Sequence, residues 1–286
     1  MRTIVLTRPL PCSNELQTQL RQAGLRVYHL PTLSLSAFQD DGAEARIRKH
    51  WPNYTVAMFV SQHAAAFAHQ HMTRLGLTWP ADIRFAAVGQ GTVDALRQLW
   101  PAHQLFIQPA PADTQDSEGL WRAIGAHPEL QSPQNLLLIR AEQGRDLLLQ
   151  LTQQARWHSD IWPCYRRTPR HWDGDELAQF THACAQNAAL VITSIEGLSA
   201  LIEQLSPELR HTAQQQRLIA IHPRIAQFAQ ASGFSDVHVC LPSQLTEQLP
   251  QLAHIDREIQ RAPPTPHQHP TQKPTGCAHC FKLQAE

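Results

Sequence analysis

Side chains that can bind anions or donate a proton stand at intervals along this sequence, each close behind a short apolar run. They are arginines, hydroxyl-bearing residues, an amide, a glycine, a proline and a tyrosine. The candidates are Arg8, Ser61, Gln62, Gly89, Thr92, Ser117, Arg140, Arg145, Tyr165, Thr193, Ser194 and Pro223. Arginines pair with carboxylates, and helices that begin just after a strand offer free backbone N–H groups to anions. This set of residues indicates a site for a polyanion or for a molecule that carries several carboxylates.

Each candidate also has a purely structural explanation. Ser61 and Ser194 can cap the helices that follow them, which is the more frequent use of a serine after a strand. The arginines can be solvated surface charges, Gly89 can serve a tight turn, and Tyr165 can pack across a strand. A capping serine can also direct its hydroxyl at a ligand, so the two roles overlap. The residues alone leave both explanations open.

Several kinds of chemistry are not expected. No Gly-x-Gly-x-x-Gly follows the first apolar run and there is no Walker-type Gly-Lys-Ser/Thr loop, which argues against a nucleotide cofactor. The Gly-x-Ser-x-Gly elbow of serine hydrolases is also missing. Metal-ligand residues do not cluster where strands are expected to end, and His63 and His222 are interpreted as polar rim residues. We therefore expect neither a cofactor nor a catalytic metal.

Composition limits the partners and the location. At 286 residues the chain is long enough for two domains, and its formal net charge is zero, with no basic stripe that would predict a nucleic-acid partner. No apolar run approaches the ~18 residues of a membrane helix. Thr7-Arg8-Pro9 interrupts any export signal, and the six cysteines are scattered, which favours reduced thiols. We expect a cytoplasmic protein without a membrane partner.

Short apolar runs alternate with amphipathic helices along the chain. The runs are continuous stretches of Val, Ile, Leu, Phe and Ala, which is typical of parallel strands covered on both faces. Strands are expected near residues 4–8, 27–37, 56–61, 84–89, 104–108, 135–140, 159–167, 188–194, 217–222 and 237–241. The pattern predicts an α/β fold of doubly wound parallel sheets. Ligands of such sheets bind beyond the carboxyl ends of the strands, where the candidate residues stand.

The second half of the chain repeats the first. The matched pairs are Ser61 with Ser194, Gly89 with His222 and Pro109 with Pro242, each 133 positions apart, and Arg8 with Arg140, 132 positions apart. A repeat of this length indicates duplicated domains rather than solenoid units. Five strands in each half suit a flavodoxin-sized sheet.

Two expected strands are unusually long and come second in each half, at residues 27–38 and 158–167. Both can run from one domain into the other, so that the chain begins in one lobe, builds the second and returns. The alternative is two domains in series, and the spacing of the repeat does not decide between them.

Together these stretches resemble the uroporphyrinogen-III synthase family over residues 3–252. The resemblance is carried by VLTRP, FVSQHAAAF, FAAVGQGTVDAL, DSEGL, LLLIRAEQGRDLL, CYRRTP and VITSIEGLSAL, in this order and spacing. It implies two flavodoxin-like α/β lobes with a cleft between them, joined by a two-stranded linker. It also implies that the first lobe is discontinuous, made of residues 1–37 plus 168–254, around an inserted lobe of residues 38–167.

The resemblance further implies an enzyme of tetrapyrrole (haem) biosynthesis. The family's reaction is that of a lyase, which cyclises hydroxymethylbilane to uroporphyrinogen III with loss of water and inversion of ring D, without a cofactor. Tyr165 matches the tyrosine of the family's second long strand, and a phenol with a reference pKa of about 10 can protonate the departing hydroxyl. The other candidates are then substrate-binding residues. A monomer is expected, to which the preceding pathway enzyme can hand the substrate.

The sequence departs from the family pattern at two places. Many members have Gly-Pro-Thr-Thr where this chain has His222-Pro223-Arg224-Ile225, and Thr-Ser-x-Asn where it has Val60-Ser61-Gln62-His63. The first change removes two hydroxyls expected near the substrate. Two other functions stay open: a non-catalytic two-lobed module that binds an anionic small molecule, and a degenerate scaffold partner in the tetrapyrrole pathway, for which the altered segment is the only indication.

The last segment, residues 255–286, differs in character from the rest. It is rich in proline and histidine and has almost no apolar periodicity, which predicts a disordered tail. Cys277 and Cys280 in this tail can bind zinc or cycle redox state, but no second ligand pair accompanies them at the spacing of a structural zinc site. A dispensable appendage is the preferred interpretation.

Overall fold

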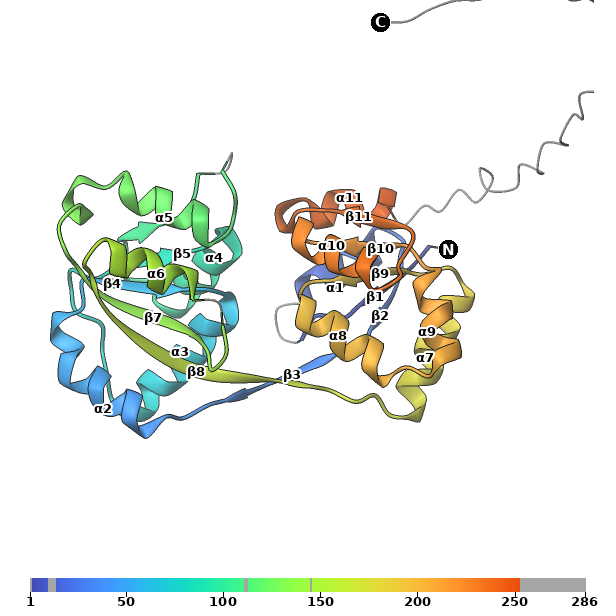
Figure 1. The fold of residues 1–286 in the computed structure, drawn as a ribbon, viewed down its shortest axis with the longest axis horizontal. Helices are drawn as coiled ribbons and strands as arrows, with labels where there is room; N and C mark the ends of the chain where they lie inside the picture. The colour runs from blue at the N-terminus through green and yellow to red at the C-terminus, as the bar shows by residue number, and fades with distance from the viewer. Residues whose placement is uncertain (1, 10–13, 111–112, 145, 253–286) are drawn as a thin grey trace, which may run out of the picture. The chain divides into compact units, whose positions relative to one another are not determined.

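The strands of this protein form two separate β-sheets in a computed structural model that describes residues 2–9, 14–110, 113–144 and 146–252. Helices and strands alternate along the chain, as the sequence predicts (Figure 1). The fold is therefore mixed α/β with predominantly parallel sheets.

The first sheet has five strands in the order β11-β10-β9-β1-β2, all of them parallel. Their bounds are Thr3–Leu6 for β1, Arg26–His29 for β2, Ala189–Ile192 for β9, Leu218–Ala220 for β10 and Val237–Val239 for β11. Helices α7 (Gly174–Ala185), α8 (Ile195–Gln204), α9 (Pro207–Gln214) and α10 (Pro223–Ala231) contribute to the core on one face. Helices α1 (Asn14–Gln22) and α11 (Leu245–Leu252) contribute to the core on the other. The coverage explains why β1, β9 and β10 are buried throughout.

The second sheet has six strands in the order β3-β8-β7-β4-β5-β6. Their bounds are Leu33–Ala37 for β3, Val56–Phe59 for β4, Arg84–Ala87 for β5, Phe106–Ile107 for β6, Asn135–Ala141 for β7 and His158–Pro169 for β8. Helices α2 (Asp41–His50), α3 (Gln62–Leu75) and α4 (Gln90–Leu99) contribute to one core, and α5 (Ser117–Gly125) and α6 (Leu147–Gln154) to the other. Along β4, Ala57 and Phe59 enter the first core and Val56 and Met58 the second, as the pleat requires.

The internal repeat is visible in the strand order. Strands β4, β5 and β6 correspond to β9, β10 and β11 at the predicted offset, and β7 and β8 correspond to β1 and β2. Each set lies in the same order in its own sheet, with β3 added at the edge of the second. All strands of the second sheet come from residues 33–169, a stretch that interrupts the strands of the first.

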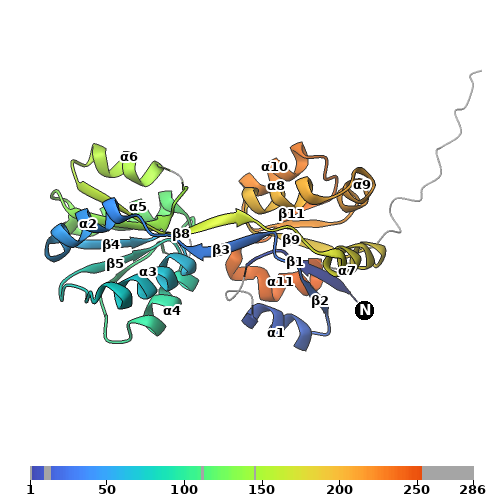
Figure 2. The same cartoon turned by 90° about the horizontal axis from the view of Figure 1, so that it is seen from below.

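The expected strand at residues 27–37 is broken into two. Leu30 N and Thr32 N still donate to β1, at Leu6 O (2.9 Å) and Thr7 O (3.2 Å), but Pro31 between them has no N–H to donate. The Pro31 carbonyl accepts instead from the indole N–H of Trp172 at 2.9 Å. From Leu33 the chain pairs antiparallel with β8 in the second sheet, and Figure 2 shows β3 lying alongside β8. The two sheets therefore share this one continuous segment of chain.

Two further expectations concern membrane-spanning helices and disulfide bonds. Within the residues described, no helix combines the length and apolar character that a membrane crossing demands. Cys164, Cys184 and Cys240 are buried and form no disulfide. The predicted tail at 255–286, with Cys277 and Cys280, lies outside the described residues.

Candidate functional site

The centre of the candidate site is a contact between Ser61 and Tyr165. Ser61 follows β4 and is the N-cap of α3, where its Oγ accepts a hydrogen bond from Ala64 N at 3.1 Å. The same Oγ shares a hydrogen bond of 3.2 Å with the Tyr165 hydroxyl. The capping role and the site role that the sequence left open are therefore compatible in one residue.

A β-bulge in β8 sets the direction of the tyrosine. Arg140 of β7 pairs with Pro163 and Ala141 pairs with Tyr165, so that Cys164 is an extra residue in the register. Cys164 and Tyr165, although consecutive, both reach the same core. A bulge of this kind re-aims a side chain next to a functional site.

Tyr165 lies in an apolar and aromatic surrounding. The residue is only 3% exposed, and its ring stacks on Phe67 with centroids 5.2 Å apart and planes at 10°. Burial raises the pKa of the phenol, while the hydrogen bond with Ser61 and the charge of Arg167 act in the opposite direction. The hydroxyl is therefore protonated at neutral pH and can act as a hydrogen-bond or proton donor.

His63, on the first turn of α3, is the third member of this group. Its ring centroid lies 6.2 Å from that of Tyr165. Burial lowers the pKa of His63 to about 4, with contributions from the positive charges of Arg8 and Arg167. Its Nε2 is buried without a hydrogen-bond partner among the described residues. Sequence reasoning assigned His63 only to the rim, but the structure makes it a neutral imidazole beside the tyrosine.

Arg8 and Gln62 extend the group. Arg8 follows β1, and its Nη2 donates to Gln62 Oε1 at 3.3 Å. His29 Nε2 donates to the Arg8 carbonyl at 2.7 Å, which fixes the backbone that carries the guanidinium. Gly91 makes room for the Gln62 amide, because a Cβ there would lie 2.3 Å from Gln62 Nε2. Sequence reasoning missed Gly91, although its place two residues after Gly89 was a usable signal.

Arg140, a second predicted arginine, lies in a different environment from Arg8. Arg140 is 8% exposed, and its Nη1 donates to Asp146 Oδ1 at 3.1 Å. Gly144 lies close against it, since a Cβ there would be 3.2 Å from Arg140 Cδ. Arg145 lies outside the described residues. Arg140 is thus engaged by a carboxylate of the protein itself.

The candidates of the second sheet stand at helix starts. Gly89 is the N-cap of α4 with φ −176°, an extended backbone that any residue adopts, so a tight turn does not explain this glycine. Thr92 is buried on the first turn of the same helix. Ser117 is the first residue of α5, but the cap is Asp116, whose Oδ1 accepts from Gly119 N at 2.9 Å. These residues bring hydroxyls and free amides to the carboxyl edge of the sheet.

The candidates of the first sheet stand at equivalent places. Ser194 is the N-cap of α8 and accepts from Gly197 N at 3.0 Å, with half-buried Thr193 before it. Pro223 is the first residue of α10, and the cap is His222, whose Nδ1 accepts from Arg224 N at 3.1 Å. His222 Nε2 also lies 3.9 Å from Asp116 Oδ2. The change from the family pattern at residues 222–225 therefore leaves the start of α10 capped by a side chain.

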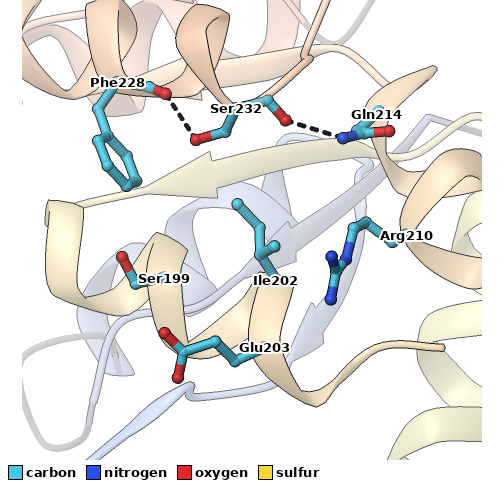
Figure 3. A pocket seen from close by; sticks show the side chains of 7 residues that line it. All are labelled: Ser199, Ile202, Glu203, Arg210, Gln214, Phe228 and Ser232. Atoms are coloured by element: carbon cyan, nitrogen blue, oxygen red, sulfur yellow. Dashed lines mark hydrogen bonds between the residues drawn. The ribbon is translucent and has the colours of Figure 1, made fainter. Parts of the chain in front are cut away.

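Two pockets lie away from this group. One of about 480 Å³ is lined by aromatic and apolar residues at the ends of α3 and α4, such as Met72 and Trp100. The other, of about 300 Å³, lies among α8, α9 and α10 (Figure 3). There, Ser232 Oγ donates to Phe228 O at 2.7 Å, and Ser232 O accepts from Gln214 at 2.8 Å. Their linings include none of the predicted site residues.

Taken together, these features place the protein among α/β proteins with polar groups at the carboxyl edge of parallel sheets. Arginine, amide, hydroxyl and phenol groups follow the carboxyl ends of parallel strands in an α/β protein, which is where such proteins bind anionic small molecules.

Comparisons with known proteins give the family. The family model described as "Uroporphyrinogen-III synthase HemD" matches residues 14–246. The uroporphyrinogen-III synthase of Salmonella typhimurium is 30% identical over 241 residues, 83% of this chain and 94% of that protein. The Escherichia coli enzyme of the same name is 29% identical over 240 residues, with the same coverage. The chain belongs to the uroporphyrinogen-III synthase family.

Solved structures agree on the fold. A mutant uroporphyrinogen III synthase of Thermus thermophilus superposes with a TM-score of 0.55 at 14% identity, covering 88% of this chain and 96% of that one. The uroporphyrinogen-III synthetase of Helicobacter pylori gives a TM-score of 0.52 at 15% identity, covering 86% and 96%.

Proposed function

We propose that the protein is an active uroporphyrinogen-III synthase, a lyase of haem and porphyrin biosynthesis. It cyclises hydroxymethylbilane to uroporphyrinogen III, with loss of water and inversion of ring D. Family membership supports the reaction, and the contact between Ser61 and Tyr165 is the observation of this chain that carries it. The proposal assigns binding and proton donation to the protein's own residues and includes no cofactor.

Tyr165 assists departure of the hydroxyl group. The pyrrole nitrogen of the substrate expels the hydroxymethyl oxygen and leaves a resonance-stabilised cation, so a weak proton donor is enough. Burial keeps the phenol protonated, and Ser61 Oγ at 3.2 Å restricts the direction in which its hydroxyl points. His63 remains neutral beside it and adds no positive charge next to the cation that forms.

The remaining candidates hold the substrate's carboxylates. Arg8 supplies a charge-assisted donor, and the first turns of α3 and α8 supply backbone N–H groups behind their serine caps. The proposed binding set is Arg8, Ser61, Gln62, Gly89, Thr92, Ser117, Arg140, Arg145, Thr193, Ser194 and Pro223. Contacts at several carboxylates position ring D so that it is attacked through its substituted carbon, since unassisted closure gives the uninverted isomer.

The site requires two lobes that share one substrate. We propose that residues 1–37 with 168–254 form the first lobe and residues 38–167 the second, each a flavodoxin-like unit. The equivalent strand order of the two sheets supports this division, and the antiparallel pair of β3 and β8 fits a two-stranded linker. The substrate then binds in a cleft between the lobes of a cytoplasmic monomer, to which the preceding enzyme can hand it, with no nucleic-acid or membrane partner.

The alternatives without catalysis are less well supported. The degenerate-scaffold interpretation rested on the altered segment at residues 222–225, but His222 caps α10 with its own side chain. A simple binding module needs the arginines yet gives no reason for a buried tyrosine held by a serine.

One assay separates all three functions. The protein is mixed with hydroxymethylbilane, and the oxidised products are resolved into the I and III isomers. A synthase yields predominantly the III isomer. A binding module or a scaffold leaves only the I isomer of spontaneous closure, and that result would refute the proposal.

A further inference from the structure

A second cluster of ionisable side chains lies at the amino end of β8, whereas Tyr165 lies towards its carboxyl end. His158 and Asp160 are two residues apart on this strand and so point to the same face. His50, the last residue of α2, lies against them. One ligand atom from each of the three side chains lies within 4.8 Å of the others. The sequence did not predict this cluster, because its members are far apart in the chain and lie away from the strand ends where ligands were expected.

The distances suit a small metal ion. His50 Nδ1 lies 3.0 Å and His158 Nε2 3.3 Å from Asp160 Oδ2. A tetrahedral zinc site with bonds of about 2.0–2.1 Å has ligand atoms roughly 3.3 Å apart, so two of the three edges are already formed. The two imidazole rings lie nearly edge to face, with centroids 5.4 Å apart and planes at 79°.

Three donors converge on one oxygen of the Asp160 carboxylate. Tyr54 OH also donates to Asp160 Oδ2, at 2.7 Å, so three donors meet one oxygen that has two lone pairs. A cation bound by the two imidazoles would replace both of their hydrogen bonds. Oδ2 would then keep two partners, the cation and Tyr54. Tyr54 is buried, and its hydroxyl would orient the ligating carboxylate as an outer-shell partner does in known metal sites.

The site is open to solvent on the histidine side. The side chains of His50 and His158 are 34% and 55% exposed, while that of Asp160 is 11% exposed. A metal ion can enter from that side, and water can fill the fourth position.

We propose that His50, His158 and Asp160 bind a divalent transition-metal ion of the zinc type, which joins the end of α2 to the beginning of β8. The role is structural. Asp160 and Tyr165 are five residues apart on one strand, or roughly 16 Å at ~3.3 Å per residue, which is too far for the ion to touch the reacting atoms. The inference does not depend on the proposed synthase activity.

The test compares zinc binding by full-length variants. Because Cys277 and Cys280 can also bind zinc, both are replaced by serine in every protein used. Zinc is measured by equilibrium dialysis in this parent, in His158→Gln and in a control, His211→Gln, which changes an exposed histidine outside the cluster. The melting temperature is recorded with and without Zn²⁺, and with Mg²⁺, which favours oxygen ligands.

The expected result is one equivalent of Zn²⁺ more in the parent and in His211→Gln than in His158→Gln. Zn²⁺, but not Mg²⁺, raises the melting temperature of the first two proteins only, because binding to the folded state stabilises it. A His50→Gln variant gives the same loss. Equal zinc content and equal thermal response in the parent and in His158→Gln would overturn the proposal. The isomer ratio of the product stays unchanged in all of these proteins, so the outcome is independent of the test of the synthase.

Discussion

At the scale of single residues, the side chains around Tyr165 make structural contacts, and the proposed function gives the same side chains chemical roles. Ser61 caps a helix and holds the tyrosine, and burial sets the protonation state of both Tyr165 and His63. The sequence indicated Ser61 and Tyr165 as candidate site residues because each lies at or just after the end of an expected strand. It did not predict that they touch, since 104 positions separate them and the pairing of β7 with both β4 and β8 brings them together.

Replacing Ser61 by alanine should separate the two roles of this serine. Ser61→Ala removes the cap of α3, for which we expect a loss of about 1 kcal/mol in the free energy of unfolding, measured in urea. It also removes the hydrogen bond between Ser61 and the Tyr165 hydroxyl. The hydroxyl is then no longer held in one direction, so formation of the III isomer should slow. Ser206→Ala is the matched control, because Ser206 caps α9 and takes no part in the site. If both variants lose stability but neither loses rate, Ser61 has no role beyond capping.

His63 should make stability depend on pH. In the unfolded chain a histidine gains its proton near pH 6.5, whereas in the folded protein the pKa of His63 is about 4. Between these values the unfolded state binds more protons, so stability falls as the pH drops from 6.5 towards 4, by up to about 3 kcal/mol. His63→Gln should lose that part of the slope in urea unfolding at a series of pH values, and His211→Gln should keep it. Parallel slopes in wild type and His63→Gln would mean that His63 is not buried as a neutral group.

At the scale of elements, the sequence predicted which segments form strands better than it predicted which sheet each strand joins. All ten expected strands are present, but the segment at 27–37 serves two sheets: it bonds to the β1 side up to Thr32 and pairs with β8 from Leu33. The bulge at Cys164 could not be predicted, since it depends on the register between β7 and β8 rather than on local sequence. Of the helix starts, the sequence suggested Ser61 and Ser194 as caps, and these residues cap α3 and α8; the caps of α5 and α10 are Asp116 and His222.

The start of α5 offers a test at this scale. Gly119 lies so close to the Thr114 carbonyl that a Cβ would be 1.9 Å from this oxygen, a backbone atom that cannot move aside cheaply. Gly119→Ala should destabilise the protein by about 1–3 kcal/mol and, by displacing Ser117, raise KM for hydroxymethylbilane. Gly125→Ala, at the other end of the same helix, meets nothing within 4 Å and should leave stability unchanged or slightly higher. Equal behaviour of the two variants would contradict the assigned packing of α5.

At the scale of the whole molecule, the internal repeat is the feature that the sequence predicted best. Offsets of 132 and 133 positions matched the strands that occupy equivalent places in the two sheets. The sequence alone left open whether the two halves follow each other in series, because strand patterns do not tell which sheet a strand joins. Net charge bears on substrate binding too: because its formal value is zero, overall charge does not attract an anionic substrate, and the proposal assigns this attraction to local groups such as Arg8.

This local attraction should be sensitive to salt. We expect KM for hydroxymethylbilane to rise with ionic strength, because added ions screen the charges of the substrate and of the exposed part of the site. Arg8→Gln should raise KM about tenfold at low salt, the loss expected for one charge-assisted hydrogen bond, and should reduce its salt dependence. The control is Arg210→Gln, in the pocket of Figure 3 and away from the site. A KM that does not respond to salt, or responds equally in both variants, would contradict carboxylate binding by Arg8.

The most direct measurement is the turnover rate of Tyr165→Phe with saturating hydroxymethylbilane, read as the III isomer formed per unit time. The substitution removes one oxygen from a buried ring that is held by stacking on Phe67, so the fold and the melting temperature should be nearly unchanged. If the phenol assists loss of water, kcat falls about 100-fold, at the lower end of what general acid catalysis contributes, and spontaneous closure shifts the product towards the I isomer. A variant that folds normally and makes the III isomer at the wild-type rate would contradict the account.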